Sequence, residues 1–364
     1  MKFTKEFLRT IPKVLLHDHL DGGVRPQTII DLAKDQKYKK LPTTDAGDLA
    51  DWFHRGATRG SLPLFLEGFE HTCAVMQTEE ALERVAYETM EDMNKDGVVY
   101  VESRFAPIFH IAKGLDTNKV VKSVLKGFEK GKKDFGVLYG LIICAMRHME
   151  PTISQEIAEL AVDFRNRGVV GFDLAGEEGG YPPKKHVEAF EYIQRENFNI
   201  TIHAGEAFGK ESIWQAIQWC GAHRIGHATR LIEDMRIKDG EVLSMGTLAQ
   251  YVLDKRIPLE ICLSSNVHTG AVPSIEEHPF GVYYRYKFRV TLNTDDRLMS
   301  NITLSDEYGK AAEIFDLNLD NLEKITINAM KSAFLPYKQR IAVIYDTLKP
   351  GFAKAREALL QQAR

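Results

Sequence analysis

The run HDHLDGG occupies positions 17–23 and directly follows the apolar segment 14–16. Apolar residues that lead into a glycine-rich turn are typical of a short buried strand. Residues two apart lie on one face of a strand, so His17 and His19 are expected to point the same way. Two imidazoles on one face can bind a first-row metal such as zinc. Alone the pair is a weak indication, because the chain has 12 histidines.

Further β-rich apolar runs alternate with longer amphipathic segments along the chain. Such alternation predicts parallel strands joined by crossover helices, and eight strands close a (β/α)8 barrel. The expected strands cover 14–19, 98–105, 137–145, 169–174, 200–203, 224–227, 259–263 and 289–293, with helices such as 79–94, 118–133, 152–166 and 185–196 between them. We therefore predict an α/β fold in which residues 1–364 form a single TIM-barrel domain.

Two regions exceed the simple repeat. A long helical insertion after the first strand is expected on the C-terminal face of the barrel, where active sites form. It contains an apolar run made up of Leu62, Leu64, Phe65, Leu66 and Phe69. This run is expected either to cover a flat ligand or to pack a helix against the barrel. Segment 303–364 is helical in pattern and is predicted to clad the barrel as extra C-terminal helices.

Bulk composition narrows the class of protein. The 364 residues are 44% hydrophobic and 27% charged, which is ordinary for a soluble globular protein. A net charge of −4 argues against a nucleic-acid or anionic-membrane partner. No apolar run is long enough to span a bilayer, and the N-terminus MKFTKEFLRTIPK lacks a signal-peptide core. The four separated cysteines lie in apolar surroundings and are expected as buried free thiols. A cytoplasmic enzyme fits these bounds, with its oligomeric state left open.

Polar residues gather where the expected strands end. His203 ends the fifth strand and Glu206 follows it, His227 ends the sixth, and Asp295 and Asp296 follow the eighth. In a (β/α)8 barrel these positions face the active-site mouth. Each residue alone has a plainer explanation, such as a core histidine bonded to the backbone, a helix N-cap or a solvated carboxylate. The fourth strand carries Asp173 near its end and is followed by Glu177, so with the first strand five strand ends carry histidine or carboxylate in a regular order, which favours one shared site.

The residue types then indicate roles within that site. Three imidazoles, from His17, His19 and His203, and the carboxylate of Asp295 suit one zinc ion with a position left for water. Bound zinc lowers the pKa of that water toward neutrality. Glu206 is close enough to donate a proton to a substrate over the metal if its pKa is raised.

Two further residues are candidates for contacts with the water and the substrate. His227 is expected to orient or deprotonate the water. Asp296, next to a candidate ligand but pointing elsewhere, is expected to hydrogen-bond a ring N–H.

Five motifs match one known family in the right order and span nearly the whole chain. They are HDHLDGG at 17–23, VGFDLAGE at 170–177, HAGE at 203–206, RIGH at 224–227 and NTDD at 293–296. In these motifs the sequence resembles the adenosine deaminases. The resemblance implies a (β/α)8 barrel with one zinc ion per chain. It also implies hydrolytic deamination of adenosine, and of 2′-deoxyadenosine, to the inosine product and ammonia.

The resemblance assigns the residues as well. The implied zinc ligands are His17, His19, His203 and Asp295. Glu206 is implied as the acid that protonates N1 of the purine, and His227 as the residue that positions and activates the zinc-bound water.

The implied substrate contacts come from four residues, of which His19 is also an implied zinc ligand. Asp296 is implied to pair with N7, the backbone N–H of Gly176 to meet N3, and Asp21 to contact the ribose. His19 is expected beside the substrate too.

Other functions stay open. Related enzymes deaminate adenine, N6-modified adenines or aminofutalosine, but the run SSNVHTGA at 264–271 is similar to that of adenosine deaminases and favours a nucleoside. A two-metal amidohydrolase commonly carries a bridging lysine at a strand end, and segment 173–176 has none. A non-catalytic binding protein is disfavoured because the set of ligands and acid is complete. The Pro-Cys-x-x-Cys signature of cytidine-type deaminases is absent.

Overall fold

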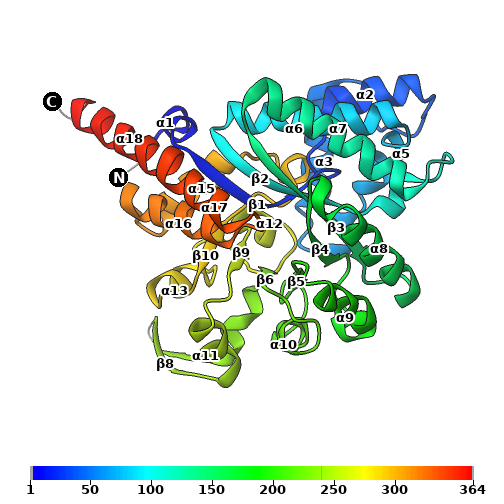
Figure 1. Cartoon of the computed structure of the whole chain (residues 1–364). Helices are drawn as coiled ribbons and strands as arrows, with labels where there is room; N and C mark the ends of the chain where they lie inside the picture. The colour runs from blue at the N-terminus through cyan, green and yellow to red at the C-terminus, as the bar shows by residue number, and fades with distance from the viewer. Residues whose placement is uncertain (1–2, 239, 363–364) are drawn as a thin grey trace.

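The computed structural model describes residues 3–238 and 240–362 (Figure 1). The strands are β1 (Lys13–His19), β2 (Val98–Phe105), β3 (Leu138–Met146), β4 (Val169–Ala175), β5 (Thr201–Ala204), β6 (Arg224–His227), β7 (Met235–Lys238), β8 (Glu241–Met245), β9 (Leu259–Ile261) and β10 (Val290–Leu292). The predicted strands agree with the observed barrel strands to within two residues at each end.

Helices connect and surround these strands. They are α1 (Lys5–Thr10), α2 (Pro26–Asp35), α3 (Ala46–Ala57), α4 (Leu62–Leu66), α5 (Phe69–Val75), α6 (Glu79–Lys95), α7 (Thr117–Phe135), α8 (Pro151–Asp163), α9 (Val187–Arg195), α10 (Lys210–Gln218), α11 (Thr247–Asp254), α12 (Leu263–His268), α13 (Phe280–Arg285), α14 (Arg297–Ser300), α15 (Leu304–Ile314), α16 (Leu319–Ser332), α17 (Tyr337–Ala342) and α18 (Lys349–Gln362). The short turns are η1 (Pro107–His110), η2 (Arg165–Arg167), η3 (Pro183–His186), η4 (Thr229–Asp234) and the π-helical η5 (Val343–Leu348).

The eight barrel strands are all parallel and form two sheets, in the orders β1-β2-β3-β4 and β10-β9-β6-β5. Two isolated parallel bridges join the sheet edges, one between Phe172 and Ile200 and one between Asp18 and Asp295. At the second, the backbone N–H of Asp295 donates to the carbonyl of His17 at 3.0 Å. Each strand therefore has two neighbours, and the predicted (β/α)8 arrangement is confirmed.

An antiparallel hairpin of β7 and β8 lies outside the barrel, between β6 and β9. The apolar-run pattern did not predict it. Its side chains are exposed or partly buried, so it has no buried face of the kind that marks a core strand.

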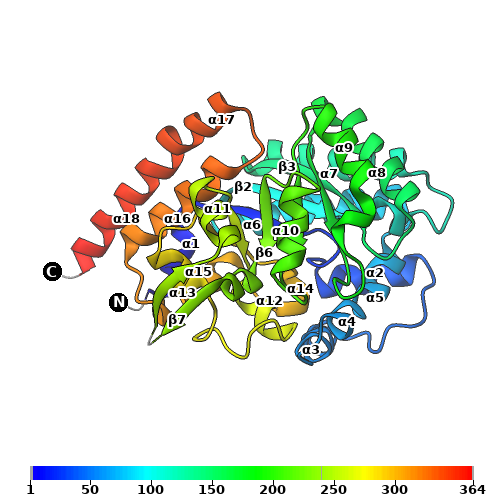
Figure 2. The same ribbon diagram turned by 90° about the horizontal axis from the view of Figure 1, so that it is seen from below.

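The predicted insertion after β1 consists of α2 to α5. Figure 2 shows α3 and α4 at the opposite end of the molecule from α17. In the C-terminal part of the chain, α16 packs against β1 and β10, as predicted for helices that clad the barrel. The single-domain organisation stays a prediction, which a core cluster extending from Leu8 to Ala355 supports.

The structure bears on two expectations from composition, the state of the cysteines and the presence of membrane-spanning helices. Cys144, Cys220 and Cys262 are buried free thiols, as predicted, and Cys73 is free but partly exposed. Within the described ranges, no helix combines the length and apolar character needed to cross a bilayer.

The barrel interior holds a network of buried charges. Arg104 on β2 donates to Asp173 on β4 at 3.0 Å and to Glu260 on β9 at 2.9 Å. Arg224 on β6 contacts the other oxygen of Glu260 at 2.5 Å and Glu102 at 2.6 Å. All five residues are at most 1% exposed. Burial raises the pKa of Glu260, but Arg104 and Arg224 outweigh it, so the pKa is held well below its usual range.

Replacing Arg104 by Met should lower the free energy of unfolding by about 3–5 kcal/mol, because Asp173 and Glu260 stay buried with their positive partner removed. Urea unfolding followed by circular dichroism measures the loss. Arg285→Met is the matched control, since its ion pair with Glu241 is exposed and such pairs contribute roughly 0–1 kcal/mol. Equal stability of the two variants would show that the buried network is not required.

Candidate active site

Four candidate ligands meet at the C-terminal end of the barrel. His17, His19, His203 and Asp295 each offer one ligand atom, and these atoms lie within 4.8 Å of one another. Oδ1 of Asp295 is 3.2 Å from Nε2 of His17 and 3.3 Å from Nε2 of His19. Nε2 of His19 is 3.0 Å from Nε2 of His203. The structure thus brings together the residues that the sequence analysis grouped.

Two buried carboxylates fix which ring nitrogens face this cluster. Nδ1 of His17 lies 2.8 Å from Glu260, and Nδ1 of His203 lies 3.0 Å from Asp173. A neutral imidazole that donates through Nδ1 carries its lone pair on Nε2. Nε2 of His17 is buried and has no hydrogen-bond partner in the described part of the chain. Acceptor atoms turned toward one another in this way, beside the carboxylate of Asp295, are the arrangement that a bound cation stabilises.

The charges in the cluster also favour a cation. Burial lowers the pKa of His17, but Asp295 and Glu260 outweigh it and the pKa is raised. Burial keeps the pKa of His19 and His203 below the usual value. Burial raises the pKa of Asp295, yet His17 and the other imidazoles hold it well below its usual range. The cluster therefore combines imidazoles with an ionised carboxylate, the set expected of a zinc site.

Glu206 lies on the loop after β5 and is 4% exposed. Thr269 donates to its Oε1 at 2.9 Å, and its Oε2 is 3.5 Å from Nε2 of His227. Burial raises the pKa of Glu206 well above its usual range, and the charge of Asp295 raises it further. This environment favours the protonated form of the carboxyl group, which is the form that a proton donor needs.

A chain of hydrogen bonds defines the tautomer of His227. The backbone N–H of Phe280 donates to Nδ1 of His278 at 2.9 Å, so Nε2 of His278 carries the ring proton. Nε2 lies 3.1 Å from Oδ1 of Asn266, which turns the amide nitrogen of Asn266 toward Nδ1 of His227 at 2.9 Å. Nδ1 of His227 therefore accepts a hydrogen bond from the amide of Asn266, and the ring proton of His227 is on Nε2.

Burial keeps the imidazole rings of His278 and His227 neutral. It lowers the pKa of His278 to about 3 and that of His227 well below its usual value. His227 therefore presents an N–H to the site. Of the two roles expected from the sequence, this tautomer favours orienting a water over deprotonating it.

A cavity of about 390 Å³ adjoins His19. The insertion contributes Leu66 and Phe69 to its wall, and the ring of Phe69 meets that of His19 edge-on at 6.4 Å. Leu62 and Phe65 are buried instead, at 8% and 2% exposed. The apolar run therefore divides between the two roles considered for it, because Leu66 and Phe69 line the cavity whereas Leu62 and Phe65 are buried in the interior.

The candidate substrate contacts lie in or near this cavity. Asp21 and Gly176 line it. Asp296 is 3% exposed, and burial together with the charge of Asp295 raises its pKa well above the usual range. One carboxyl oxygen of Asp21 and one of Asp296 are buried with no hydrogen-bond partner among the described residues, which leaves them free to bind a ligand.

With this geometry established, the comparisons with known proteins identify the family. Residues 12–349 match the family model for adenosine deaminase. Adenosine deaminase 1 of Streptomyces coelicolor is 52% identical over 361 residues, which cover 98% of this chain and 91% of that protein. The chain belongs to the adenosine deaminase family. The adenosine deaminase of Mycobacterium ulcerans is also 52% identical, over 356 residues that cover 96% of this chain and 98% of that protein.

Solved structures agree with the fold. The Arabidopsis protein ADAL complexed with GMP superposes with a TM-score of 0.80 at 26% identity and covers 96% of this chain and 98% of its own. The adenine deaminase of Arthrobacter aurescens gives a TM-score of 0.84, covering 95% of this chain and 99% of its own. At 22% identity it shows the fold alone.

Close packing explains the glycines in two of the family motifs. A side-chain carbon on Gly22 would overlap the carboxyl group of Asp296, and one on Gly226 would lie 3.0 Å from Cε1 of His17. The backbone is strained at His227, which follows Gly226, and at Asp295, which precedes Asp296, with φ values of 66° and 60°. Such left-handed conformations cost roughly 1–3 kcal/mol each in non-glycine residues and concentrate at functional sites.

The run at 264–271, first noted for its relation to substrate class, supports the candidate catalytic residues directly. Ser265 donates to Oδ2 of Asp295 at 2.6 Å, Asn266 binds His227, and Thr269 binds Glu206. These contacts explain why small polar side chains are needed in this run.

The structure also reveals a residue that the sequence analysis did not single out. The buried carboxylate of Glu178 accepts four backbone N–H groups, from Gly205 at 2.6 Å, Glu206 at 3.0 Å, Ala207 at 2.7 Å and Phe208 at 3.0 Å. Hydrogen bonds to an ionised acceptor are stronger than neutral ones. Glu178 thus fixes the loop that carries Glu206. In the sequence it is only one of two adjacent glutamates before glycines, a pattern typical of a solvated turn.

Replacing Glu178 by Ala should lower kcat by about 100-fold, because an ångström-scale displacement of a catalytic group costs about that much. Steady-state assay of adenosine deamination gives kcat, and elemental analysis of the same sample should show an unchanged metal content. Glu188→Ala, at an exposed position on α9, is the control and should match the parent protein. A Glu178→Ala variant with full activity would refute the positioning role.

Proposed function

We propose that the protein hydrolyses adenosine to inosine and ammonia in the cavity beside His19, with one zinc ion held by His17, His19, His203 and Asp295. The observation that carries this proposal is the meeting of four ligand atoms within 4.8 Å next to a cavity of about 390 Å³. Membership of the adenosine deaminase family supports the reaction, a hydrolysis of a C–N bond. The cytoplasm remains the proposed location.

The donor set fits zinc better than a harder cation. Imidazole nitrogens suit zinc, whereas magnesium and calcium prefer oxygen ligands. When bound, zinc supplies a water that is acidic enough to act as a nucleophile at neutral pH. His227 contributes its Nε2–H, which holds the attacking water in place.

The remaining residues act on the purine. Glu206 donates its proton to N1, which makes C6 more electrophilic and so favours attack by water. Asp296 is neutral when its pKa is raised, so its carboxyl group donates to N7, a hydrogen-bond acceptor. The backbone N–H of Gly176 binds N3, and Asp21 accepts from the ribose. His19 lies in the wall of the cavity beside the bound nucleoside.

The substrate is tested by side-by-side assay of adenosine, 2′-deoxyadenosine, adenine and aminofutalosine. Adenosine should have the highest kcat/KM, with 2′-deoxyadenosine next, because Asp21 is placed to bind a sugar hydroxyl. A higher kcat/KM for adenine or aminofutalosine would assign the site to another 6-aminopurine and overturn the proposal.

Replacing Glu206 by Gln should keep the metal and lower kcat by roughly 10²–10⁴-fold, the usual contribution of a general acid. The variant retains the size of the side chain and its bond from Thr269 but has no acidic proton. Elemental analysis and steady-state kinetics on one preparation separate the two effects. Normal turnover would exclude Glu206 as the acid, and loss of metal would place it among the ligands.

The contact of Asp296 with N7 is tested with 7-deazaadenosine, which lacks that acceptor. The parent protein should prefer adenosine by about 10–100-fold in kcat/KM, since an unmet buried hydrogen bond costs about 1–3 kcal/mol. In Asp296→Ala the preference should disappear while the metal stays bound. An undiminished preference in the variant would show that another group binds N7.

A further inference from the structure

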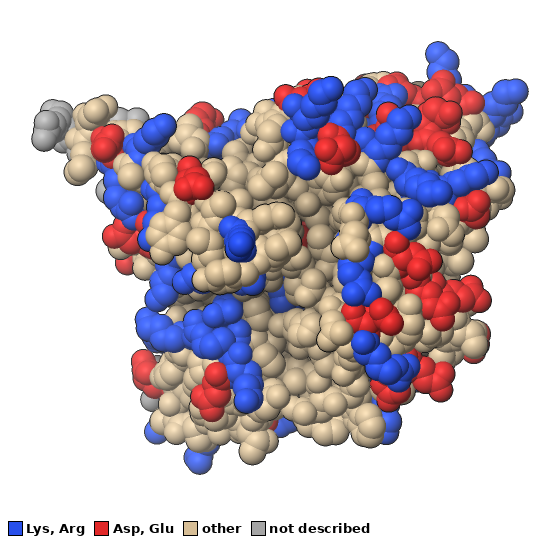
Figure 3. Space-filling view, viewed as in Figure 1, with Lys and Arg blue, Asp and Glu red and all other residues tan. Residues whose placement is uncertain are grey.

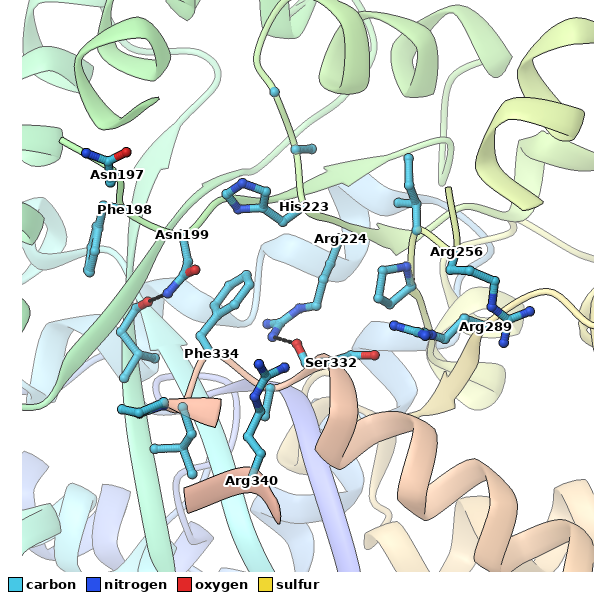
Figure 4. A pocket seen from close by; sticks show the side chains of 18 of the residues that line it. Asn197, Phe198, Asn199, His223, Arg224, Arg256, Arg289, Ser332, Phe334 and Arg340 are labelled. Carbon is cyan, nitrogen blue, oxygen red and sulfur yellow. Dashed lines mark hydrogen bonds between the residues drawn. The ribbon is translucent and has the colours of Figure 1, made fainter. Parts of the chain in front are cut away.

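A second cavity, of about 830 Å³, lies at the end of the barrel away from the metal cluster. Its walls include segments 197–199, 221–223 and 255–258, which directly precede β5, β6 and β9. Residues before parallel strands lie at the N-terminal end of a barrel, whereas the active site lies at the C-terminal end. Segment 332–336, between α16 and α17, completes the wall (Figure 4).

The wall of this cavity is positively charged. Its lining includes Arg165, Arg224, Lys255, Arg256, Arg289 and Arg340, and none of the described residues that line it is Asp or Glu. Figure 3 shows Lys and Arg side chains gathered beside the hollow on this face. Arg165 and Arg224 have carboxylate partners in Glu196 and in the barrel network. Among the residues that the structure describes, no carboxylate forms an ion pair with the other four lining cations.

Three of these arginines, Arg256, Arg289 and Arg340, lie close together. In the described part of the chain, no carboxylate forms an ion pair with Arg256, Arg289 or Arg340. Arg256 and Arg340 donate only to backbone carbonyls, those of Lys287 and Lys331. Nε of Arg289 and Nε of Arg340 are buried without a hydrogen-bond partner. Burial lowers the pKa of Arg289, and the charges of Arg256 and Arg340 lower it further.

The side chains are arranged to share one ligand. In Figure 4 Arg340 and Arg289 lie on opposite sides of Ser332, with Arg256 beside Arg289. Phe334 stacks on Arg224 at 3.6 Å and covers that paired guanidinium. The exposed ring of Tyr251 lines the cavity as well and offers an apolar surface.

We propose that this cavity binds a phosphorylated small molecule with two or more negative charges. Guanidinium groups match phosphate oxygens with paired N–H donors, and an anion here would remove the mutual repulsion of the three arginines. The cavity volume is that of a small-molecule pocket rather than a flat macromolecular interface. The site is separate from the deaminase centre and does not depend on the proposed reaction.

Isothermal titration calorimetry of the full chain with sodium phosphate, sodium tripolyphosphate and ATP tests the proposal. Tripolyphosphate and ATP should bind the parent protein, and phosphate more weakly. The double variant Arg289→Met/Arg340→Met should bind tripolyphosphate at least tenfold more weakly. Arg236→Ala, an exposed arginine on β7 outside the cavity, should bind as the parent does. Tighter binding of ATP than of tripolyphosphate would indicate that the cavity takes a nucleotide. Tighter binding of tripolyphosphate would indicate that it takes a polyphosphate.

Equal affinity in the parent and the double variant, or no binding of any probe, would overturn the proposal. Tripolyphosphate can also remove a bound metal ion, but the heat of that process would be the same for the parent and the double variant. A signal of this kind is therefore scored as equal affinity. Circular dichroism and kcat for adenosine should be unchanged in the double variant. If that variant fails to fold, Arg256→Ala, at an exposed position, replaces it and should weaken tripolyphosphate binding at least threefold. Unchanged binding in that variant would also contradict the site.

Discussion

The contact of Arg104 with Asp173 and Glu260 is the constraint on which the site depends. These carboxylates bind Nδ1 of His203 and His17 and so turn both Nε2 atoms toward the candidate metal cluster. Buried carboxylates are stable only with paired charges and satisfied hydrogen bonds. The barrel supplies these partners from β2, which carries Arg104, and from β6, which carries Arg224, whereas the carboxylates lie on β4 and β9. The orientation of the histidines is thus a property of the whole barrel and not of the run at 17–23 alone.

The same environment separates the protonation states of neighbouring acids. The imidazoles around Asp295 hold its pKa well below the usual range, whereas burial and the charge of Asp295 raise the pKa of Glu206 and Asp296 well above theirs. A site with one permanent anion and two proton donors suits a reaction in which a cation is held while ring nitrogens receive hydrogen bonds or protons. Glu178 and the run at 264–271 keep these groups in place with bonds to the backbone and to small polar side chains.

Much of this architecture is predictable from the sequence, because apolar runs mark the strands and polar residues mark their ends. His203 and Asp295 were found in this way. Arg104 and Glu260 were not, since a charged residue inside a short apolar run carries no sign of the partner that neutralises it. Glu178 was missed because its four bonds go to the backbone. The β7–β8 hairpin was missed because it has no buried face.

Metal reconstitution tests the central claim most directly. Protein stripped with a chelator is titrated with zinc, and deamination of adenosine is followed by the change in ultraviolet absorbance on conversion to inosine. The account predicts negligible activity without metal and a linear rise that ends at one equivalent of zinc per chain, with His203→Asn showing no rise. Full activity in the stripped protein, or a rise that continues to two equivalents, would contradict a single metal held by His17, His19, His203 and Asp295.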